Sequence, residues 1–361
     1  MKKIFAACSL AFAFVLPAHA SQLDDLLAKH LQDKAVPAMA ALRIKDGKVV
    51  EQVVRGVRAN DSPEKATLSD RWHIGSNAKA LTATMMARLV ERGVLSWDKT
   101  MQQYFPEMQM QAQYRDLTLV DLLSHRAGMP PNIDEKWIEA TRDDKRPMFE
   151  VRQEFALKGL NEPPIGTARG EMFYSNTGYV IASAIAEKVT GKSFEVLMQE
   201  EVFLPLGIKT TFDPAKRGEV IGHENGKPVV GAAVENPPAM GAAGEVRLTM
   251  QEWAKFSIDQ MLGERGKGKL LKAETYRFLH AQQGTSKSAL GWGIKDDFPK
   301  DAPVRMISHA GSDGHWYAII GLAPDSLEGL LIAANAAEGT EAALKESMIF
   351  KEIAAQFGKK K

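Results

Sequence analysis

The stretch IGSNAKALTATMMARLVERGVL, residues 74–95, places a serine and a lysine at the start of an apolar helical pattern. Its apolar residues recur at intervals of three and four, which predicts a helix over 77–92. Because residues i and i+3 share a helix face, Lys79 can reach the hydroxyl of Ser76. The pair is either a nucleophile with its base or a lysine beside a serine that only caps the helix.

The Ser-x-x-Lys spacing occurs three times in the chain, so other features must select among the pairs. Ser62 lies in a polar segment with Pro63, which indicates a surface turn. Ser96 follows Gly93, where the preceding helix is expected to end, and no apolar period continues after it. Only Ser76 combines the positive end of a helix dipole with an apolar helix, whose burial lowers the pKa of a lysine. Ser76 is therefore the candidate nucleophile, with capping as the alternative.

The first twenty residues have the pattern of a secretory signal peptide. Lys2 and Lys3 precede an apolar run over 4–16, and Pro17-Ala-His-Ala20 supplies small residues at the cleavage positions. The run is short for a membrane span, so cleavage after Ala20 is favoured over an uncleaved anchor. The mature protein, residues 21–361, is then expected to be secreted, and periplasmic in a cell with two membranes.

Composition excludes several other functions. Apolar residues make up 45% of the 361-residue chain, which permits a large core. Loss of the signal peptide removes Cys8, the only cysteine, and changes the formal charge from +1 to −1, so no disulfide or cysteine nucleophile is expected. No later run of 18 apolar residues exists, and the basic segment 265–269 is short and glycine-rich, which favours a solvated loop. Nucleic acid and membranes are not expected as partners, and the sequence leaves the oligomeric state open.

Strand patterns gather at the two ends of the chain and helical patterns in the middle. A helix over 21–33 precedes a β-hairpin in which Asp46-Gly47 turns between strands 38–44 and 49–57. Further strands are expected at 289–294, 304–308, 316–322 and 330–334, and a closing helix at 340–357. Central helices are expected at 77–92, 118–124, 148–158, 177–190, 193–203 and 250–262.

This order of elements predicts an α/β fold. A single domain over 21–361 takes its sheet from about 21–75 and 285–361, and a mainly helical region is inserted at about 76–284. A cleft between two such regions is a common place for a small-molecule site.

A second candidate stretch contains Tyr174-Ser175-Asn176, just before a predicted helix. A tyrosine beside a lysine can give and take a proton, and an asparagine can hydrogen-bond a substrate amide. The alternative is a loop tyrosine that packs on the core, with Asn176 capping the helix.

A third candidate stretch, ISHAGSDGHW at residues 307–316, includes the end of a predicted strand. His309 would place a titratable side chain at the strand edge, Gly311 allows close approach, and the N–H of Ser312 can point at a substrate oxygen. These three residues are the substrate-binding candidates here, and a purely structural histidine is the alternative.

In their order, Ser76-x-x-Lys79, Tyr174-Ser-Asn176 and His309-x-Gly311 resemble the signature of the serine β-lactamase and penicillin-recognising hydrolase family. The chain is most similar to the class C-like branch, which includes D,D-carboxypeptidases, esterases and D-amino-acid amidases. Four further segments look like other parts of that family and extend the resemblance to roughly residues 24–357. They are 121–128, 174–191, 203–207 and 241–246. In the first of them, Ala127 stands in place of a serine. The resemblance implies a β-lactamase/transpeptidase-like fold, with an antiparallel sheet flanked by helices.

The third motif departs from the family pattern. His309 replaces a lysine and Ala310 replaces a threonine or serine, which in the family help to hold the carboxylate of a β-lactam. A histidine with an ordinary pKa of about 6.5 is only about a quarter charged at pH 7, and Ala310 has no hydroxyl. We therefore expect an ester, amide or D-amino-acid peptide as substrate, with a true β-lactamase or D,D-carboxypeptidase as the alternative.

The resemblance also implies a mechanism. Ser76 attacks a carbonyl carbon and forms an acyl-enzyme, while Lys79 and Tyr174 share the base and acid roles. Asn176 holds the substrate and the lysine, and the N–H groups of Ser76 and Ser312 form the oxyanion hole. No metal or organic cofactor is expected, since the sequence has no C-x-x-C or H-E-x-x-H motif.

Two rival functions belong to other classes. A Ser-His-Asp hydrolase is disfavoured because no G-x-S-x-G motif occurs. A non-catalytic binder of cell-wall peptides on the same fold would not need Ser76, Lys79 and Tyr174 together. A covalent adduct that depends on Ser76 would distinguish the enzyme from the binder.

Overall fold

The computed structural model describes residues 21–31, 35–210, 212–231, 235–298, 303–336 and 341–359. The proposed signal peptide, residues 1–20, lies outside the described residues and stays a prediction. Within the described ranges, no helix combines the length and the apolar character that crossing a membrane requires.

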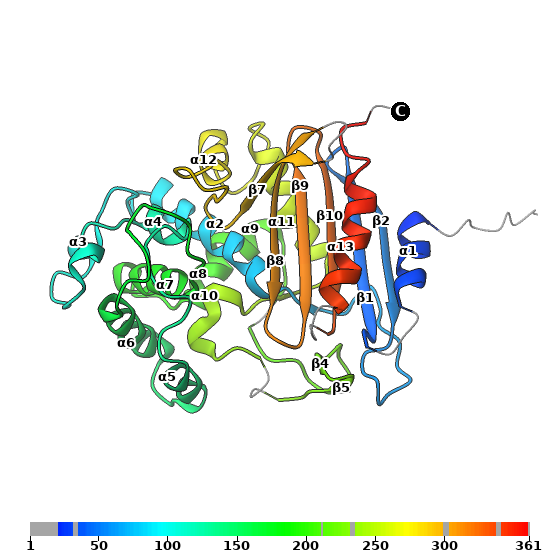
Figure 1. The fold of residues 1–361 in the computed structure, drawn as a ribbon, viewed down its shortest axis with the longest axis horizontal. Helices are drawn as coiled ribbons and strands as arrows, with labels where there is room; N and C mark the ends of the chain where they lie inside the picture. Colours follow the sequence, from blue (N-terminus) through cyan, green and yellow to red (C-terminus); the bar gives the residue numbers. More distant parts are fainter. Residues whose placement is uncertain are drawn as a thin grey trace, which may run out of the picture.

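A six-stranded antiparallel sheet takes its strands from both ends of the chain (Figure 1). Across the sheet, the order is β2 (Lys48–Gly56), β1 (Ala38–Lys45), β10 (Glu328–Ala334), β9 (Tyr317–Ala323), β8 (Val304–Ser312) and β7 (Gly293–Phe298). The hairpin β1–β2 turns at Asp46 and Gly47, which both have positive φ, as the sequence predicted. Pairing of β1 with β10 joins the two ends of the chain, from Met39 opposite Ala334 to Ile44 opposite Gly329.

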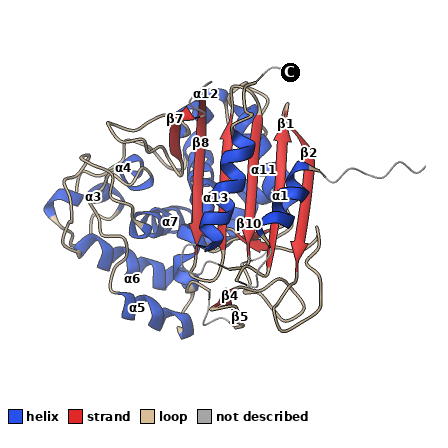
Figure 2. Ribbon diagram, turned by 45° about the vertical axis from the view of Figure 1, so that its right-hand side comes forward, coloured by secondary structure: helices blue, strands red, loops and turns tan. Residues whose placement is uncertain are grey.

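Two layers of helix cover the two faces of this sheet (Figure 2). One face packs against α1 (Gln22–His30) and α13 (Glu341–Ala354), through Leu23, Leu27 and Ile353 among others. The other face packs against α11 (Met250–Gly263) and the larger core of the molecule. Successive residues of β1 alternate between the two cores, because neighbouring side chains of a strand point to opposite faces.

The residues between β2 and β7 form the mainly helical side of the molecule, on the left of Figure 1. Its helices, apart from α11, are α2 (Ala78–Glu91), α3 (Met101–Tyr104), α4 (Leu119–Leu123), α5 (Glu135–Ala140), α6 (Met148–Asn161), α7 (Asn176–Thr190), α8 (Phe194–Met198), α9 (Leu204–Leu206), α10 (Gly241–Gly244) and α12 (Ala273–Leu279). A π-helical segment, Gln199–Phe203, joins α8 to α9. Two short ladders pair β3 (Trp72–His73) with β6 (Arg247–Leu248), and β4 (His223–Glu224) with β5 (Lys227–Pro228).

Two of the predicted strands have a boundary that lies more than two residues from the predicted one. The apolar run that begins at Ala289 was expected to be a strand, but β7 starts at Gly293. The run turns against α2 instead: Gly291 has φ +79°, and a Cβ there would lie 2.7 Å from the Cα of Ala80. At the other boundary, β8 does not end at Ser308 but pairs with β9 as far as Ser312. The third motif therefore lies on the strand itself.

A buried arginine joins the helices that surround the site. Arg152 on α6 is fully buried, and its Nη1 donates to Glu187 Oε1 of α7 at 2.7 Å. Its guanidinium also pairs with Glu195 of α8 and donates to the carbonyl of Pro238 at 2.7 Å. This side chain therefore links three helices to the segment that leads into α10.

We predict that Arg152→Ala lowers the free energy of unfolding by about 3–5 kcal/mol, because it leaves the fully buried Glu187 without a counter-charge. Urea denaturation measures the change. Arg146→Ala is the control, since it removes only solvent-exposed pairs with Asp144 and Glu154 and is expected to change the free energy of unfolding much less. Equal losses in the two variants would contradict the role of Arg152.

Candidate active site

Ser76 lies in a single 3-10 turn, Gly75–Asn77, directly before α2. Asn77 is the N-cap residue of α2 and makes no side-chain capping bond, so Ser76 does not cap this helix and the capping alternative is wrong. Gly75 has φ +51°, and a Cβ there would lie 2.5 Å from the amide nitrogen of Ser312. Only glycine fits this position, and the turn is consequently held against the end of β8.

Lys79 is buried in the first turn of α2 and points at Ser76. Its Nζ donates to Ser76 Oγ at 2.9 Å, to Asn176 Oδ1 at 2.7 Å and to the carbonyl of Ala243 at 2.6 Å. These three acceptors match the three N–H groups of an ammonium. Complete burial lowers the pKa of Lys79 well below its usual value. The amine can therefore lose a proton more easily than an exposed lysine and receive one from the hydroxyl beside it.

The two other Ser-x-x-Lys pairs lack this arrangement. The Ser62 hydroxyl accepts from the backbone N–H of Glu64 at 3.2 Å, and that of Ser96 accepts from the N–H of Asp98 at 3.2 Å. Lys99, the partner of Ser96 in the sequence motif, lies over the ring of Tyr104 instead. Both hydroxyls therefore bond within their own segments, and the surface turn predicted at Ser62 is confirmed.

Tyr174 lies close to both Ser76 and Lys79. Its hydroxyl lies near Ser76, which moderates the rise in the pKa of the phenol, and its ring centroid lies 4.8 Å from Lys79 Nζ. Burial raises the pKa of Tyr174 to about 12, so the phenol keeps its proton at neutral pH. The residue still exposes 37% of its surface, which makes it reachable from solvent.

Asn176 is the first residue of α7, but it does not cap that helix. The cap is Ser175, whose hydroxyl accepts from Gly178 N at 3.2 Å, so the capping alternative for Asn176 is wrong. The Asn176 amide is oriented from both ends, because its Oδ1 accepts from Lys79 and its Nδ2 donates to Asn132 Oδ1 at 2.9 Å.

The sequence did not assign a role to His125, which lies against Tyr174 with 4.4 Å between ring centroids. Its Nδ1 accepts from the Ser175 N–H at 3.0 Å, and burial with the nearby Lys79 lowers its pKa well below the usual value. The neutral ring therefore holds the Tyr174–Asn176 loop in place. Its position inside the family-like segment 121–128 was the available signal.

The end of β8 completes the site opposite the serine. A Cβ at Gly311 would lie 2.5 Å from Ser76 N and 2.3 Å from Ile74 O, so the strand and the turn meet backbone to backbone. Asn77 fixes this contact, because its Nδ2 donates both to Ile74 O at 2.7 Å and to Ala318 O of β9 at 3.1 Å. The amides of Ser76 and Ser312 are thereby brought to one place.

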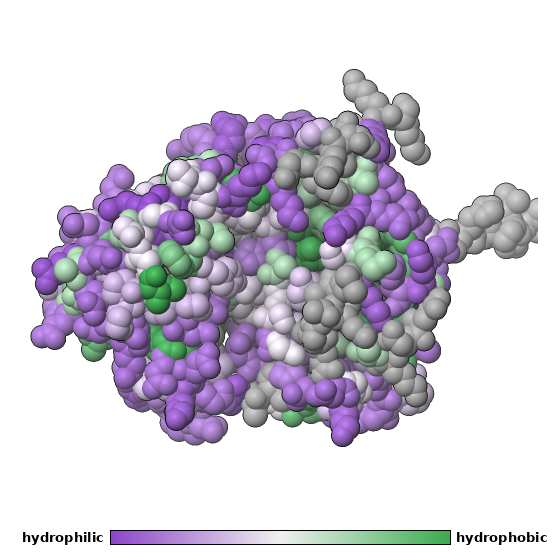
Figure 3. Space-filling model, in the orientation of Figure 1, coloured by the Kyte–Doolittle hydropathy of each residue, from purple (hydrophilic) through white to green (hydrophobic). Residues whose placement is uncertain are grey.

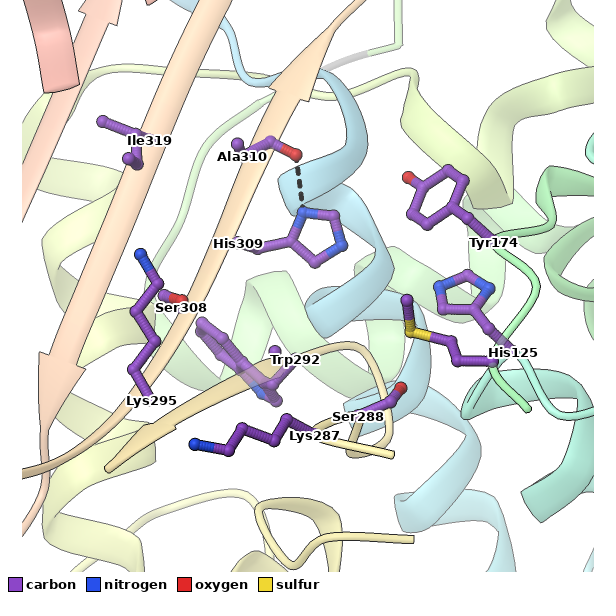
Figure 4. Close-up of a pocket in the computed structure, with 12 residues that line it drawn as sticks. His125, Tyr174, Lys287, Ser288, Trp292, Lys295, Ser308, His309, Ala310 and Ile319 are labelled. Carbon is purple, nitrogen blue, oxygen red and sulfur yellow. Dashed lines mark hydrogen bonds between the residues drawn. The ribbon is translucent and has the colours of Figure 1, made fainter. Parts of the chain in front are cut away.

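His309 faces Tyr174 with 6.3 Å between ring centroids. Burial and the nearby Lys79 lower the pKa of His309 to about 4, so the ring is neutral at pH 7 and not a quarter charged, as an ordinary histidine would be. Its Nδ1 lies 2.7 Å from the carbonyl oxygen of Ala310, and a neutral nitrogen beside a carbonyl must carry the hydrogen. The remaining nitrogen, Nε2, is then an acceptor in the site (Figure 4).

A pocket of ≈ 360 Å³ opens beside Tyr174 and His309. Figure 4 shows these two side chains facing each other across it, with Trp292 below. The wall also includes the apolar side chains of Met172 and Ile319 and the basic side chains of Lys287 and Lys295. In the view of Figure 3, paler and apolar residues gather along the middle of an otherwise hydrophilic face, between the helical region and the sheet.

The sheet with its helical region, and the serine, lysine and tyrosine that meet between them, define a protein of the penicillin-recognising type. The Beta-lactamase family profile matches residues 23–351, and the chain belongs to this family, whose members are typically serine hydrolases.

Curated relatives are distant. Protein flp of Staphylococcus aureus strain MW2 is 25% identical over 328 residues, which cover 87% of this chain and 62% of that protein. The chain thus spans less than two thirds of the length of that relative. Penicillin-binding protein 4* of Bacillus subtilis strain 168 is 28% identical over 145 residues, which cover 39% of this chain and 30% of that protein.

Solved structures confirm the predicted β-lactamase/transpeptidase-like fold. The octameric penicillin-binding protein homologue from Pyrococcus abyssi matches with a TM-score of 0.76 at 22% identity, over 92% of this chain and 78% of that chain. The structure of SurE with D-Leu matches with a TM-score of 0.72 at 20% identity, over 92% of this chain and 74% of that chain.

We predict that Lys79→Arg lowers the rate of acylation by about 10²–10⁴-fold, the range for loss of a general base, because arginine stays protonated. Single-turnover kinetics with a nitrophenyl ester measure this rate. Lys99→Arg makes the same exchange in the Ser96 pair and is expected to leave the rate unchanged. Wild-type acylation in Lys79→Arg would exclude Lys79 as the base.

Proposed function

We propose that this protein is a serine hydrolase that acts through an acyl-enzyme on Ser76. The observation that carries the proposal is the hydroxyl of Ser76, which accepts a hydrogen bond from a buried amine, Lys79 Nζ at 2.9 Å, and lies near the phenol of Tyr174. A nucleophile with a base and an acid on the same oxygen is the arrangement that acyl transfer requires. A non-catalytic binder has no use for it.

The pKa values of Lys79 and Tyr174 shift in opposite directions, which supports different roles for the two residues in proton transfer. Lys79 has a lowered pKa, so its neutral amine takes the proton as Ser76 Oγ forms a bond to the substrate carbonyl carbon. Tyr174 has a raised pKa and keeps its proton, so it donates to the leaving group as the acyl bond breaks. Water then releases the acyl group through the reverse transfers.

Negative charge on the carbonyl oxygen develops where the turn and β8 meet. The N–H groups of Ser76 and Ser312 are the proposed donors, because Gly75 and Gly311 let the two backbones approach closely. Loss of one such donor typically raises the barrier by about 2.7–4 kcal/mol.

The environment of His309 favours an uncharged leaving group. A neutral ring with an acceptor nitrogen does not attract a substrate carboxylate, and Ala310 supplies no hydroxyl. The apolar wall at Met172 and Trp292 suits an ester or peptide with an apolar side chain. We therefore propose small esters, amides and D-amino-acid peptides as substrates in preference to β-lactams.

Secretion is part of the same proposal. The charged start, the apolar run over 4–16 and the small residues before position 21 support export of the mature protein to the periplasm. A short ester or peptide outside the cytoplasm is then the expected substrate.

We predict that Ser76→Ala abolishes ester turnover and covalent labelling by a fluorescent phosphonate while the protein stays folded. The hydroxyl makes no capping bond to α2, so its removal is expected to change the melting temperature little. Ser62→Ala and Ser96→Ala are the controls and should be labelled like the wild type. A labelled Ser76→Ala protein would overturn the assignment, and an unlabelled wild type would favour the non-catalytic binder.

We predict that His309→Lys combined with Ala310→Thr raises the ratio of kcat/KM on a penicillin to kcat/KM on a nitrophenyl ester at least about tenfold. One well-aligned charged hydrogen bond to the carboxylate contributes about 1.5–3 kcal/mol, which corresponds to that factor or more. In the wild type, affinity for a carboxylate-bearing substrate should improve only as the pH falls toward 4, because His309 gains its proton there. An uncharged ester is the control, and an unchanged ratio in the double variant would exclude His309 as the selectivity element.

A further inference from the structure

A histidine and two carboxylates are buried directly behind the serine turn. His73 on β3 is fully buried, with Nε2 3.3 Å from Glu245 Oε1 and Nδ1 3.6 Å from Asp313 Oδ2. The side chain of Asp313 is also fully buried, and that of Glu245 is nearly so. Neither the acyl transfer proposed above nor the predicted motifs use this cluster.

The three residues come from the three segments that build the catalytic site. His73 precedes the turn that carries Ser76, and Asp313 directly follows Ser312. Glu245 follows α10, whose Ala243 accepts a hydrogen bond from Lys79. The imidazole therefore lies where the serine turn, the β8–β9 hairpin and the segment after α10 meet.

The Asp313 carboxylate is fixed within its hairpin. Its Oδ1 accepts from His315 N and Trp316 N, each at 3.0 Å. Among the described residues, Oδ2 has no hydrogen-bond donor and faces only the His73 ring at ion-pair distance. A change in His73 is thus transmitted to the backbone that carries Ser312.

The protonation state of His73 determines whether its Nδ1 interacts with the serine turn or with the β8–β9 hairpin. Burial opposes the charged ring, but Asp313, Glu245 and the more distant Glu235 outweigh burial and raise the pKa of His73 to about 9. Burial raises the pKa of Glu245 to about 7 despite the nearby His73. Nδ1 also lies 3.2 Å from Gly75 N; a neutral ring accepts that N–H, whereas the protonated ring forms an ion pair with the Asp313 carboxylate, whose Oδ2 lies 3.6 Å away. At neutral pH, the protonated ring therefore ties the serine turn to the hairpin.

We infer that His73 is a positioning residue, which bridges Glu245 and Asp313 and so holds the amides of Ser76 and Ser312 at the spacing of an oxyanion hole. The inference rests on the proposed acyl transfer at Ser76. The two amides belong to separate segments, which meet backbone to backbone at Gly75 and Gly311. Asn77 links the turn to β9 through Ala318 O, and His73 links it to the residue that follows Ser312. His73 itself touches no substrate.

Three variants separate the contacts of the cluster. His73→Ala removes the bridge, whereas His73→Asn places an amide near the position of Nδ1 and can still reach Asp313. Asp313→Asn keeps the acceptor for His315 and Trp316 but removes the negative charge that pairs with His73. Tyr276→Phe is the matched control, because it removes a buried hydrogen bond to Asp259 on α11. This hydrogen bond involves neither the serine turn nor the β8–β9 hairpin.

The readouts are the inactivation rate kinact and the binding constant KI for a fluorescent phosphonate, the affinity for a boronic acid that forms a tetrahedral adduct, and the melting temperature. For His73→Ala and Asp313→Asn, kinact should fall about 10- to 100-fold, somewhat less than loss of a whole oxyanion-hole donor, while KI stays within about threefold. Affinity for the boronic acid should fall by a similar factor, because its oxygen occupies the hole. His73→Asn should retain more activity than His73→Ala, and Tyr276→Phe should lose only thermal stability.

The outcomes distinguish the two proposals. If the wild type is labelled at Ser76 but kinact of Asp313→Asn and His73→Ala matches that of Tyr276→Phe, only the role of His73 is overturned. Losses confined to KI, or to the melting temperature, overturn it as well. A wild type that the phosphonate does not label overturns the acyl-transfer proposal together with the inference built on it. Should His73→Ala not fold, the near-isosteric Asp313→Asn decides the question alone.

Discussion

Burial of the Lys79 amine beside Ser76 is the constraint on which the rest of the site depends. A buried amine must satisfy its N–H groups, and here the acceptors come from the serine turn, the start of α7 and the end of α10. These segments can meet only if the helical region is held firmly. Arg152 contributes to this, because it joins α6, α7 and α8 to the residues that precede α10.

The same burial sets the protonation of the whole site. Desolvation lowers the pKa values of Lys79, His125 and His309 and raises that of Tyr174. The site therefore holds neutral histidines and a protonated phenol at physiological pH, beside a lysine that gives up its proton more readily than an exposed one. His73 is the exception, since Asp313 and Glu245 stabilise its charge behind the serine, away from the pocket.

The sheet forms the side of the site that faces the helical region, because its strands come from both ends of the chain. Pairing of β1 with β10 places the β8–β9 hairpin next to a serine that is far away in sequence. Glycines at positions 75 and 311 then allow the turn and the strand to touch through their backbones. The proposed oxyanion hole is thus a product of topology, and the side chains of Asn77 and His73 hold its two halves together.

The sequence by itself determined the local features of this protein. The apolar period after Ser76 predicted α2, Asp46-Gly47 predicted the hairpin, and the order of the three motifs indicated the family. Only the tertiary structure decided that the apolar run at Ala289 turns against α2 and that β8 continues through the third motif, because both depend on contacts with distant segments. It also decided the neutral state of His309 and the His125 and His73 contacts, since a pKa and a packing partner are set by which groups surround a side chain in space, and spacing along one chain does not encode that.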